Sequence, residues 1–381
     1  MTRLNPGSKT LRTILTLVAC SVIVVACSRE TFVVLDESAA EVGAREPVLV
    51  ASTRQFHDGY FGSARQSGLS YVHYDVRIPP NRDVGTVEGV TTLEVDADNR
   101  TQFVVSDAVQ LDSNSEFRRA LRQELIARPP WEREVMVFVH GYNTDFAAGL
   151  YRTAQIRHDF NVPGVAVHYA WPSAGRALAY AYDRDSALFA RDGLEELLTT
   201  LASDGHDIVL VAHSMGGAVT METLRQLSIG NRRNVLRRIT GVFLLSPDID
   251  VDVFVAQASR LDPIPPNFLI FTSQQDRALR FSARLSGRRD RLGTLPAADQ
   301  IADLDVTLID VSDFESGMGD QFNHLTPASS PATVSILRDV AMVNLSLQDE
   351  VDNEILMLPG MLMSIRQATR IMLEPQNTQG R

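Results

Sequence analysis

The chain has 381 residues, of which 44% are hydrophobic and 22% are charged, and its formal net charge is −11. This is the composition of a globular protein with room for one large α/β domain or two small ones. The acidic balance argues against a nucleic-acid partner and against adhesion of the whole body to anionic lipid. Both cysteines lie within the first 27 residues, which excludes a disulfide framework or a cysteine metal site in the remainder.

The first 27 residues predict an export signal. Three cations and no acidic residue precede an apolar run over 13–26, which is too short for a comfortable membrane span. The run ends in VVAC at 24–27, which resembles a bacterial lipobox and implies cleavage before Cys27 and lipid attachment to it. The residues LVAC at 17–20 are a weaker match, because the apolar run before them would be very short. An uncleaved anchor is the alternative interpretation.

Beyond this segment, residues 28–45 are polar and acidic and we expect a tether. Residues 46–345 are expected to form the domain, and 346–381 a C-terminal tail. We expect strands at 47–52, 71–78, 134–139, 164–171, 208–212, 239–246, 267–272 and 305–310, and helices at 115–127, 145–160 and 176–202. Near-continuous apolar strands that alternate with helices predict a mostly parallel sheet with helices on both faces.

The most specific motif follows the strand at 208–212. Ser214 lies between the small residues Ala212 and Gly216, and a helical pattern comes directly after. Small residues on both sides let strand and helix approach closely, so the turn exposes the serine Oγ as a nucleophile for an acyl carbon. Ala212 stands where this motif usually has glycine. One methyl group is the smallest possible departure, so we expect slight crowding and a working turn.

A serine nucleophile needs a base and an acid. The only histidine after Ser214 is His324, which lies in a loop beyond the last apolar strand of the domain. An imidazole with a pKa near neutrality can take the serine proton and return it to a leaving group. Asp276, which lies between the two, is favoured as the acid that orients the imidazole. Asp248 and Asp250, after the preceding strand, are the alternatives.

A tetrahedral intermediate also needs backbone N–H donors for its oxyanion. Met215, directly after the nucleophile, would supply the first. The second is expected from the loop after the strand at 134–139, which begins with His140 and Gly141. Tyr142 is the favoured donor in that loop, with Asn143 as the next candidate. His213, beside the nucleophile, is interpreted as a packing residue.

Five segments together resemble the bacterial α/β-hydrolase family of unknown function (domain of unknown function 900), within the esterase/lipase superfamily. They are FVHGYN at 138–143, AWPS at 170–173, AHSMG at 212–216, SPDID at 246–250 and SQQDRAL at 273–279. The resemblance covers about 48–340. It implies the α/β-hydrolase fold and a triad of Ser214, Asp276 and His324, without a defined substrate. The short stretch between Ser246 and the next strand has room for one helix and no large cap domain.

These observations predict an envelope-anchored serine hydrolase that cleaves a small-molecule or lipid ester of a carboxylic acid through an acyl-enzyme intermediate. A peptidase, a thioesterase or an acyltransferase would use the same triad, and a non-catalytic envelope lipoprotein with this fold is the alternative outside enzymes. No glycine-rich phosphate loop and no metal-ligand spacing occurs, so we expect neither cofactor nor metal. The lipid anchor predicts the periplasmic side of a bacterial membrane, and Ser28 favours the outer membrane by analogy with bacterial lipoproteins.

Overall fold

The computed structural model describes residues 31–89, 101–287, 291–317, 320, 322–335, 338, 357–358, 361–362 and 369–372. The predicted signal segment and Cys27 lie outside these residues. Within the described helices, none combines the length and the apolar character needed to cross a bilayer.

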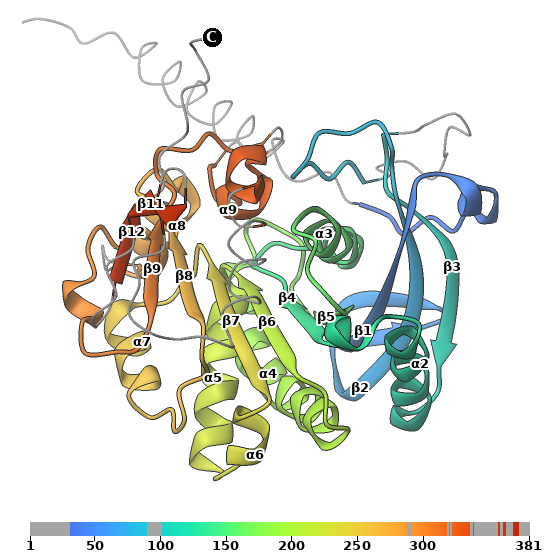
Figure 1. Cartoon of the computed structure of the whole chain (residues 1–381), viewed down its shortest axis with the longest axis horizontal. Coiled ribbons are helices and arrows are strands. Elements are labelled where there is room, and N and C mark those ends of the chain that lie inside the picture. Colours follow the sequence, from blue (N-terminus) through green and yellow to red (C-terminus); the bar gives the residue numbers. More distant parts are fainter. Residues whose placement is uncertain are drawn as a thin grey trace, which may run out of the picture.

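A sheet of ten strands, counted over the described residues, runs through the centre of the molecule (Figure 1). Its spatial order is β12-β9-β8-β7-β6-β4-β5-β1-β2-β3. The strands are β1 (Ala44–His57), β2 (Tyr60–Ile78), β3 (Val104–Leu111), β4 (Val135–Val139), β5 (Val165–Ala170), β6 (Ile208–His213), β7 (Ile239–Leu245), β8 (Phe268–Thr272), β9 (Thr307–Asp310) and β12 (Thr369–Met372). The pairs from β12 to β1 are parallel, whereas β2 pairs antiparallel with both β1 and β3. The predicted mostly parallel sheet is confirmed.

Helices cover both faces of this sheet. They are α2 (Asn114–Ile126), α3 (Phe146–Asp159), α4 (Tyr180–Ser203), α5 (Met215–Ile229), α6 (Arg233–Leu236), α7 (Val251–Ala258), α8 (Arg277–Leu285) and α9 (Thr326–Ser329). Short 3-10 helices span Glu37–Glu41, Pro130–Glu132, Leu292–Thr294 and Asp299–Ile301, and a small hairpin pairs β10 (Met357–Leu358) with β11 (Met361–Leu362).

The strand β4 explains why the sequence of this sheet is apolar without interruption. Val135, Val137 and Val139 pack in the core under α2, α4 and α5. Met136 and Phe138 point to the opposite face and pack in the core under α3. Successive side chains of a strand point to opposite faces, so a strand buried on both sides needs an apolar residue at every position.

Residues 31–43 differ from the predicted tether, because they run along the body. The Thr31 N–H donates to Asp145 Oδ2 (3.1 Å), the Tyr151 hydroxyl donates to the Phe32 carbonyl (3.0 Å), and the Asp36 N–H donates to the Val105 carbonyl (2.8 Å). Backbone N–H and C=O groups outside helices and strands also need hydrogen-bond partners, and these contacts supply some of them.

The C-terminal region also differs from a simple tail. β12 adds a strand to the edge of the sheet, where Thr369–Met372 pairs in parallel with Thr307–Asp310 of β9. Between β7 and β8 the chain forms one helix, α7, which agrees with the predicted absence of a large cap domain.

Candidate active site

Ser214 lies at the turn between β6 and α5 in a strained conformation, with φ 53° and ψ −121°. Positive φ is unfavourable for a residue with a side chain and persists only where neighbours hold the backbone. Here the Ser214 N–H donates to the Leu245 carbonyl (3.0 Å), and the Ser214 carbonyl accepts from the N–H groups of Gly217 (3.0 Å) and Asp248 (3.1 Å). The strained turn is therefore held on both sides, as the small-x-Ser-x-Gly motif predicts.

Two glycines let the loop after β4 lie against this turn. A Cβ on Gly216 would lie 2.4 Å from the carbonyl oxygens of both Val139 and His140. A Cβ on Gly141 would lie 2.6 Å from Nδ1 of His213, the residue directly before Ser214. Both separations are too short for real side chains, so the close approach of loop and turn requires glycine at each position.

His324 and Asp276 form a direct pair. The imidazole donates from Nδ1 to Asp276 Oδ2 at 2.7 Å, and the Asp276 side chain is fully buried. Asp276 Oδ1 accepts from the Leu279 N–H (2.9 Å) as the N-cap of α8, which fixes the carboxylate. With Nδ1 engaged, Nε2 is the ring nitrogen available for proton transfer.

The environment of His324 favours its charged form. Burial alone would lower the pKa of this imidazole, but the charge and hydrogen bond of Asp276, together with the charges of Asp248 and Asp320, raise it above 6.5. A raised pKa makes the imidazole a stronger base for taking a proton from a hydroxyl.

Two further residues hold the histidine loop. The sequence did not identify Asp320, and it assigned His213 a packing role only. Asp320 accepts from the N–H groups of His324 (3.0 Å) and Leu325 (2.7 Å). His213 donates from Nε2 to the His324 carbonyl (3.2 Å), and the two rings lie 4.6 Å apart. Because His213 directly precedes Ser214, this contact brings the histidine loop to the nucleophile turn. The packing role predicted for His213 fits these contacts.

The alternative acids have other partners. The Asp248 carboxylate accepts from the hydroxyls of Ser282 (2.7 Å) and Tyr180 (2.9 Å) and pairs with Arg291 at 3.3 Å. Asp250 caps α7 by accepting from the N–H groups at the start of that helix. The aspartate that contacts the imidazole ring of His324 is thus Asp276, the one that the sequence favours.

The predicted oxyanion donors lie in the expected elements. Met215 is the first residue of α5, so its N–H has no acceptor within the helix. The Asn143 N–H donates to Asp183 Oδ2 (3.1 Å) and is therefore committed to that carboxylate. The Trp171 indole donates to the His140 carbonyl (2.6 Å) and stacks on the His140 ring, which fixes the start of this loop.

Two buried charged residues, Asp183 and Arg54, hold the oxyanion loop and the loop after β5 in place. Asp183 of α4 also accepts from the Ser173 hydroxyl (2.6 Å) and the Ala174 N–H (2.7 Å). Arg54 of β1 donates to the carbonyls of Thr144 (2.9 Å) and Ser173 (3.1 Å). Burial lowers the pKa of Arg54 to about 10, so the guanidinium stays charged at neutral pH.

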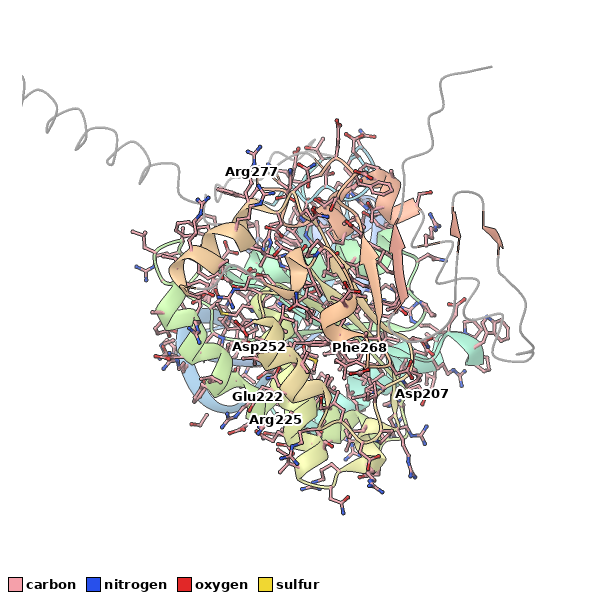
Figure 2. All side chains as sticks on the ribbon, turned by 90° about the vertical axis from the view of Figure 1, so that its left-hand side faces the viewer. Asp207, Glu222, Arg225, Asp252, Phe268 and Arg277 are labelled. Carbon is pink, nitrogen blue, oxygen red and sulfur yellow. The ribbon has the colours of Figure 1, made fainter. Side chains whose placement is uncertain are left out.

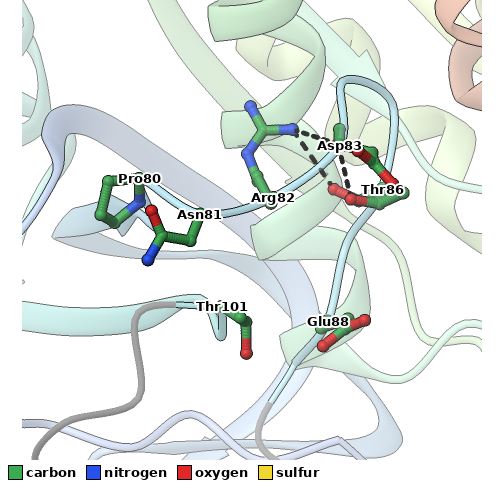
Figure 3. Close-up of a pocket in the computed structure, with 7 residues that line it drawn as sticks. All are labelled: Pro80, Asn81, Arg82, Asp83, Thr86, Glu88 and Thr101. Atoms are coloured by element: carbon green, nitrogen blue, oxygen red, sulfur yellow. Dashed lines mark hydrogen bonds between the residues drawn. The ribbon is translucent and has the colours of Figure 1, made fainter.

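A cavity of about 480 Å³ lies outside the candidate active site, in the loops beside β2 and β3 (Figure 3). Its lining residues are Pro80, Asn81, Arg82, Asp83, Thr86, Glu88 and Thr101. Arg82 is occupied by an ion pair with Asp159, and none of the predicted catalytic residues lines this cavity. Within the described residues, no group of three or more His, Cys, Asp or Glu side chains could hold a metal ion.

The fold and this arrangement define an α/β hydrolase. The sequence model of the family described as "Alpha/beta hydrolase of unknown function (DUF900)" matches residues 113–340, and the chain belongs to this family. A search of curated proteins gave no match.

Solved structures of hydrolases resemble the chain distantly. A predicted CIB-like hydrolase from Thermoplasma acidophilum is 15% identical with a TM-score of 0.33, over 58% of this chain and 90% of its own. An esterase from the fungus Rhizomucor miehei is 11% identical with a TM-score of 0.38, over 81% and 87%. An esterase/lipase from an uncultured bacterium is 10% identical with a TM-score of 0.33, over 81% and 89%. Likenesses of this size carry no conclusion about activity.

Proposed function

We propose that the protein is a serine hydrolase that cleaves carboxylic esters through an acyl-enzyme intermediate. One observation carries the proposal: the buried pair of Asp276 and His324, whose loop also contacts the residue directly before Ser214. A strained serine, an imidazole and a buried carboxylate from three separate loops are the parts that acyl transfer requires.

In the proposed mechanism, Ser214 Oγ attacks the ester carbonyl while His324 Nε2 takes its proton. Asp276 holds the ring through Nδ1 and stabilises the imidazolium that forms. The N–H groups of Met215 and Tyr142 donate to the oxyanion. His324 then protonates the leaving alcohol. In the second half of the reaction, His324 takes a proton from water, which attacks the acyl-enzyme, and returns that proton to Ser214 Oγ as the carboxylic acid leaves.

Attachment to the bacterial envelope is part of the proposal. The lipobox resemblance at 24–27 supports lipidation of Cys27, which would hold the enzyme on the periplasmic side of a membrane, with the outer membrane favoured. Replacement of Cys27 by alanine is expected to remove the acyl groups from the intact mass and release the protein from the membrane fraction.

The catalytic proposal is tested with a fluorophosphonate probe and p-nitrophenyl esters of increasing chain length. The probe is expected to label the wild-type protein, which should also hydrolyse at least one ester. Ser214→Ala is expected to show neither labelling nor hydrolysis. Ser115→Ala, an exposed serine at the start of α2, is the matched control and should keep both. A wild-type protein without labelling, or equal labelling of Ser214→Ala, would overturn the proposal. Hydrolysis of amides or thioesters in preference to oxygen esters would instead favour a peptidase or a thioesterase.

A further inference from the structure

Helix α8 presents an exposed face that combines cations with apolar side chains. This face, called the α8 face below, consists of Arg277, Arg280, Phe281, Arg284 and Leu285, all exposed. Phe281 and Leu285 are 57% and 56% exposed and lie one turn apart, so their side chains are neighbours on the surface of the helix. The nine residues of α8 include no acidic residue.

The charge of the α8 face is not balanced locally. Elsewhere Arg118, Arg157 and Arg233 each pair with a carboxylate. The three arginines of α8 have no ion-pair partner within the part of the chain that the structure describes. In a chain with a net charge of −11, this leaves a local positive surface that a negatively charged partner would complement. Arginine and large apolar residues on one helix are the combination found where helices lie in the headgroup region of a bilayer.

The α8 face lies at the same edge of the sheet as the candidate active site. α8 begins directly after Asp276, which binds His324, and the Arg277 N–H donates to the Phe322 carbonyl (2.9 Å) in the histidine loop. Phe322 is itself 61% exposed, so a third apolar side chain is available at this edge. Figure 2 shows Arg277 near the top of the view and Asp207, which directly precedes β6, well below it.

The route of the N-terminal chain indicates what covers this edge. Thr31 is held by Asp145, which caps α3 directly after the oxyanion loop. Three residues lie between Cys27 and Thr31, so the four Cα–Cα steps that join them can span at most about 14 Å. If Cys27 carries the lipid, the bilayer must therefore lie close to the carboxyl edge of the sheet. Two separate parts of the chain thus point to one membrane-facing side.

We propose that the α8 face docks on an anionic phospholipid surface and turns the candidate active site toward the bilayer. The arginines would bind lipid phosphates, and Phe281, Leu285 and Phe322 would enter the headgroup region. The acidic body does not oppose this, because charges beyond about 8–10 Å are largely screened at physiological salt. The docking does not depend on the proposed esterase activity, so the two proposals can fail separately.

The test uses the full chain made without lipid by replacing Cys20 and Cys27 with alanine. Binding is measured by co-sedimentation with vesicles of phosphatidylcholine alone and with 30% phosphatidylglycerol. We expect binding to be about tenfold to a hundredfold tighter with phosphatidylglycerol, and this difference should vanish in 0.5 M salt. Any binding by the N-terminal segment is common to all variants and does not affect the comparison.

The triple variant Arg277→Gln, Arg280→Gln, Arg284→Gln should lose the preference for phosphatidylglycerol. The control triple Arg119→Gln, Arg232→Gln, Arg237→Gln removes the same charge from exposed sites on and beside α2 and α6 and should keep it. The pair Phe281→Ser, Leu285→Ser should weaken binding to both vesicles.

Equal binding to both vesicles by wild type, or equal losses in both triple variants, would overturn the proposal. So would displacement by soluble polyglutamate with no effect of the Phe281→Ser, Leu285→Ser pair, because that result indicates an acidic protein as the partner.

Discussion

At the scale of single residues, Asp183 has the most consequential environment outside the proposed triad. Burial raises the pKa of its carboxyl group, and hydrogen bonds from Ser173, Ala174 and Asn143, with the nearby charge of Arg54, oppose that effect. A buried carboxylate with this many donors fixes whatever those donors belong to. Here they belong to the oxyanion loop and the loop after β5, so Asp183 is interpreted as a positioning residue.

Replacement of Asp183 by asparagine keeps its shape but turns one acceptor oxygen into a donor. Asn143 and Ser173 donate to one carboxylate oxygen and Ala174 donates to the other, so an amide cannot keep all three contacts. The loop that carries Tyr142 should therefore lose its alignment. We expect kcat for the best ester substrate to fall about 10- to 100-fold, with KM changed less than about twofold, because a displaced oxyanion donor affects the transition state most.

Asp185→Asn is the control, since that residue is exposed on the same helix. Steady-state kinetics and thermal melting of both variants separate loop alignment from stability. A proportional loss of activity and folded protein in Asp183→Asn would contradict the positioning role.

The raised pKa of His324 predicts a pH dependence. The base must be neutral to accept the serine proton, so kcat/KM should rise with pH, and the midpoint of that rise should lie above 6.5. Asp248→Asn removes one of the negative charges that raise this pKa and should move the midpoint to lower pH. Asp252→Asn, exposed on α7, removes the same charge and should leave the midpoint unchanged. A shift to higher pH in Asp248→Asn would mean that His324 is not the group observed.

At the scale of elements, the junction between β6 and α5 depends on one of two adjacent glycines. A Cβ at Gly216 would meet backbone carbonyls at 2.4 Å, whereas a Cβ at Gly217 would meet the Pro247 side chain at 3.3 Å. Gly216→Ala must therefore push the oxyanion loop away from the nucleophile turn. We expect it to cost about 2–3 kcal/mol of unfolding free energy and most of the esterase activity.

Gly217→Ala provides the comparison and should cost under about 1 kcal/mol, because a side chain can shift where a backbone cannot. Urea unfolding and ester hydrolysis of the two variants provide the measurement. Similar losses in both would show that the junction has no special dependence on position 216.

At the scale of the whole molecule, the sequence predicted what local patterns determine. The strands from β4 to β8 are apolar at nearly every position, and a motif of five residues identified the nucleophile turn. Arg54 and Asp183 could not be predicted in the same way. They meet the oxyanion loop only after segments around 54, 144, 173 and 183 have come together in the fold, and neither residue stands in a motif. The pairing of β12 could not be predicted either, because a segment of four residues is too short to show a strand periodicity.

The pairing of β12 with β9 has a consequence for synthesis. Thr369–Met372 leaves the ribosome after its partner strand Thr307–Asp310, which lies well before it in the chain. During that interval β9 is an unprotected edge whose N–H and C=O groups can pair with another nascent chain. The pairing of β12 thus covers this edge and ends its exposure, which gives Thr369–Met372 a role in solubility separate from catalysis.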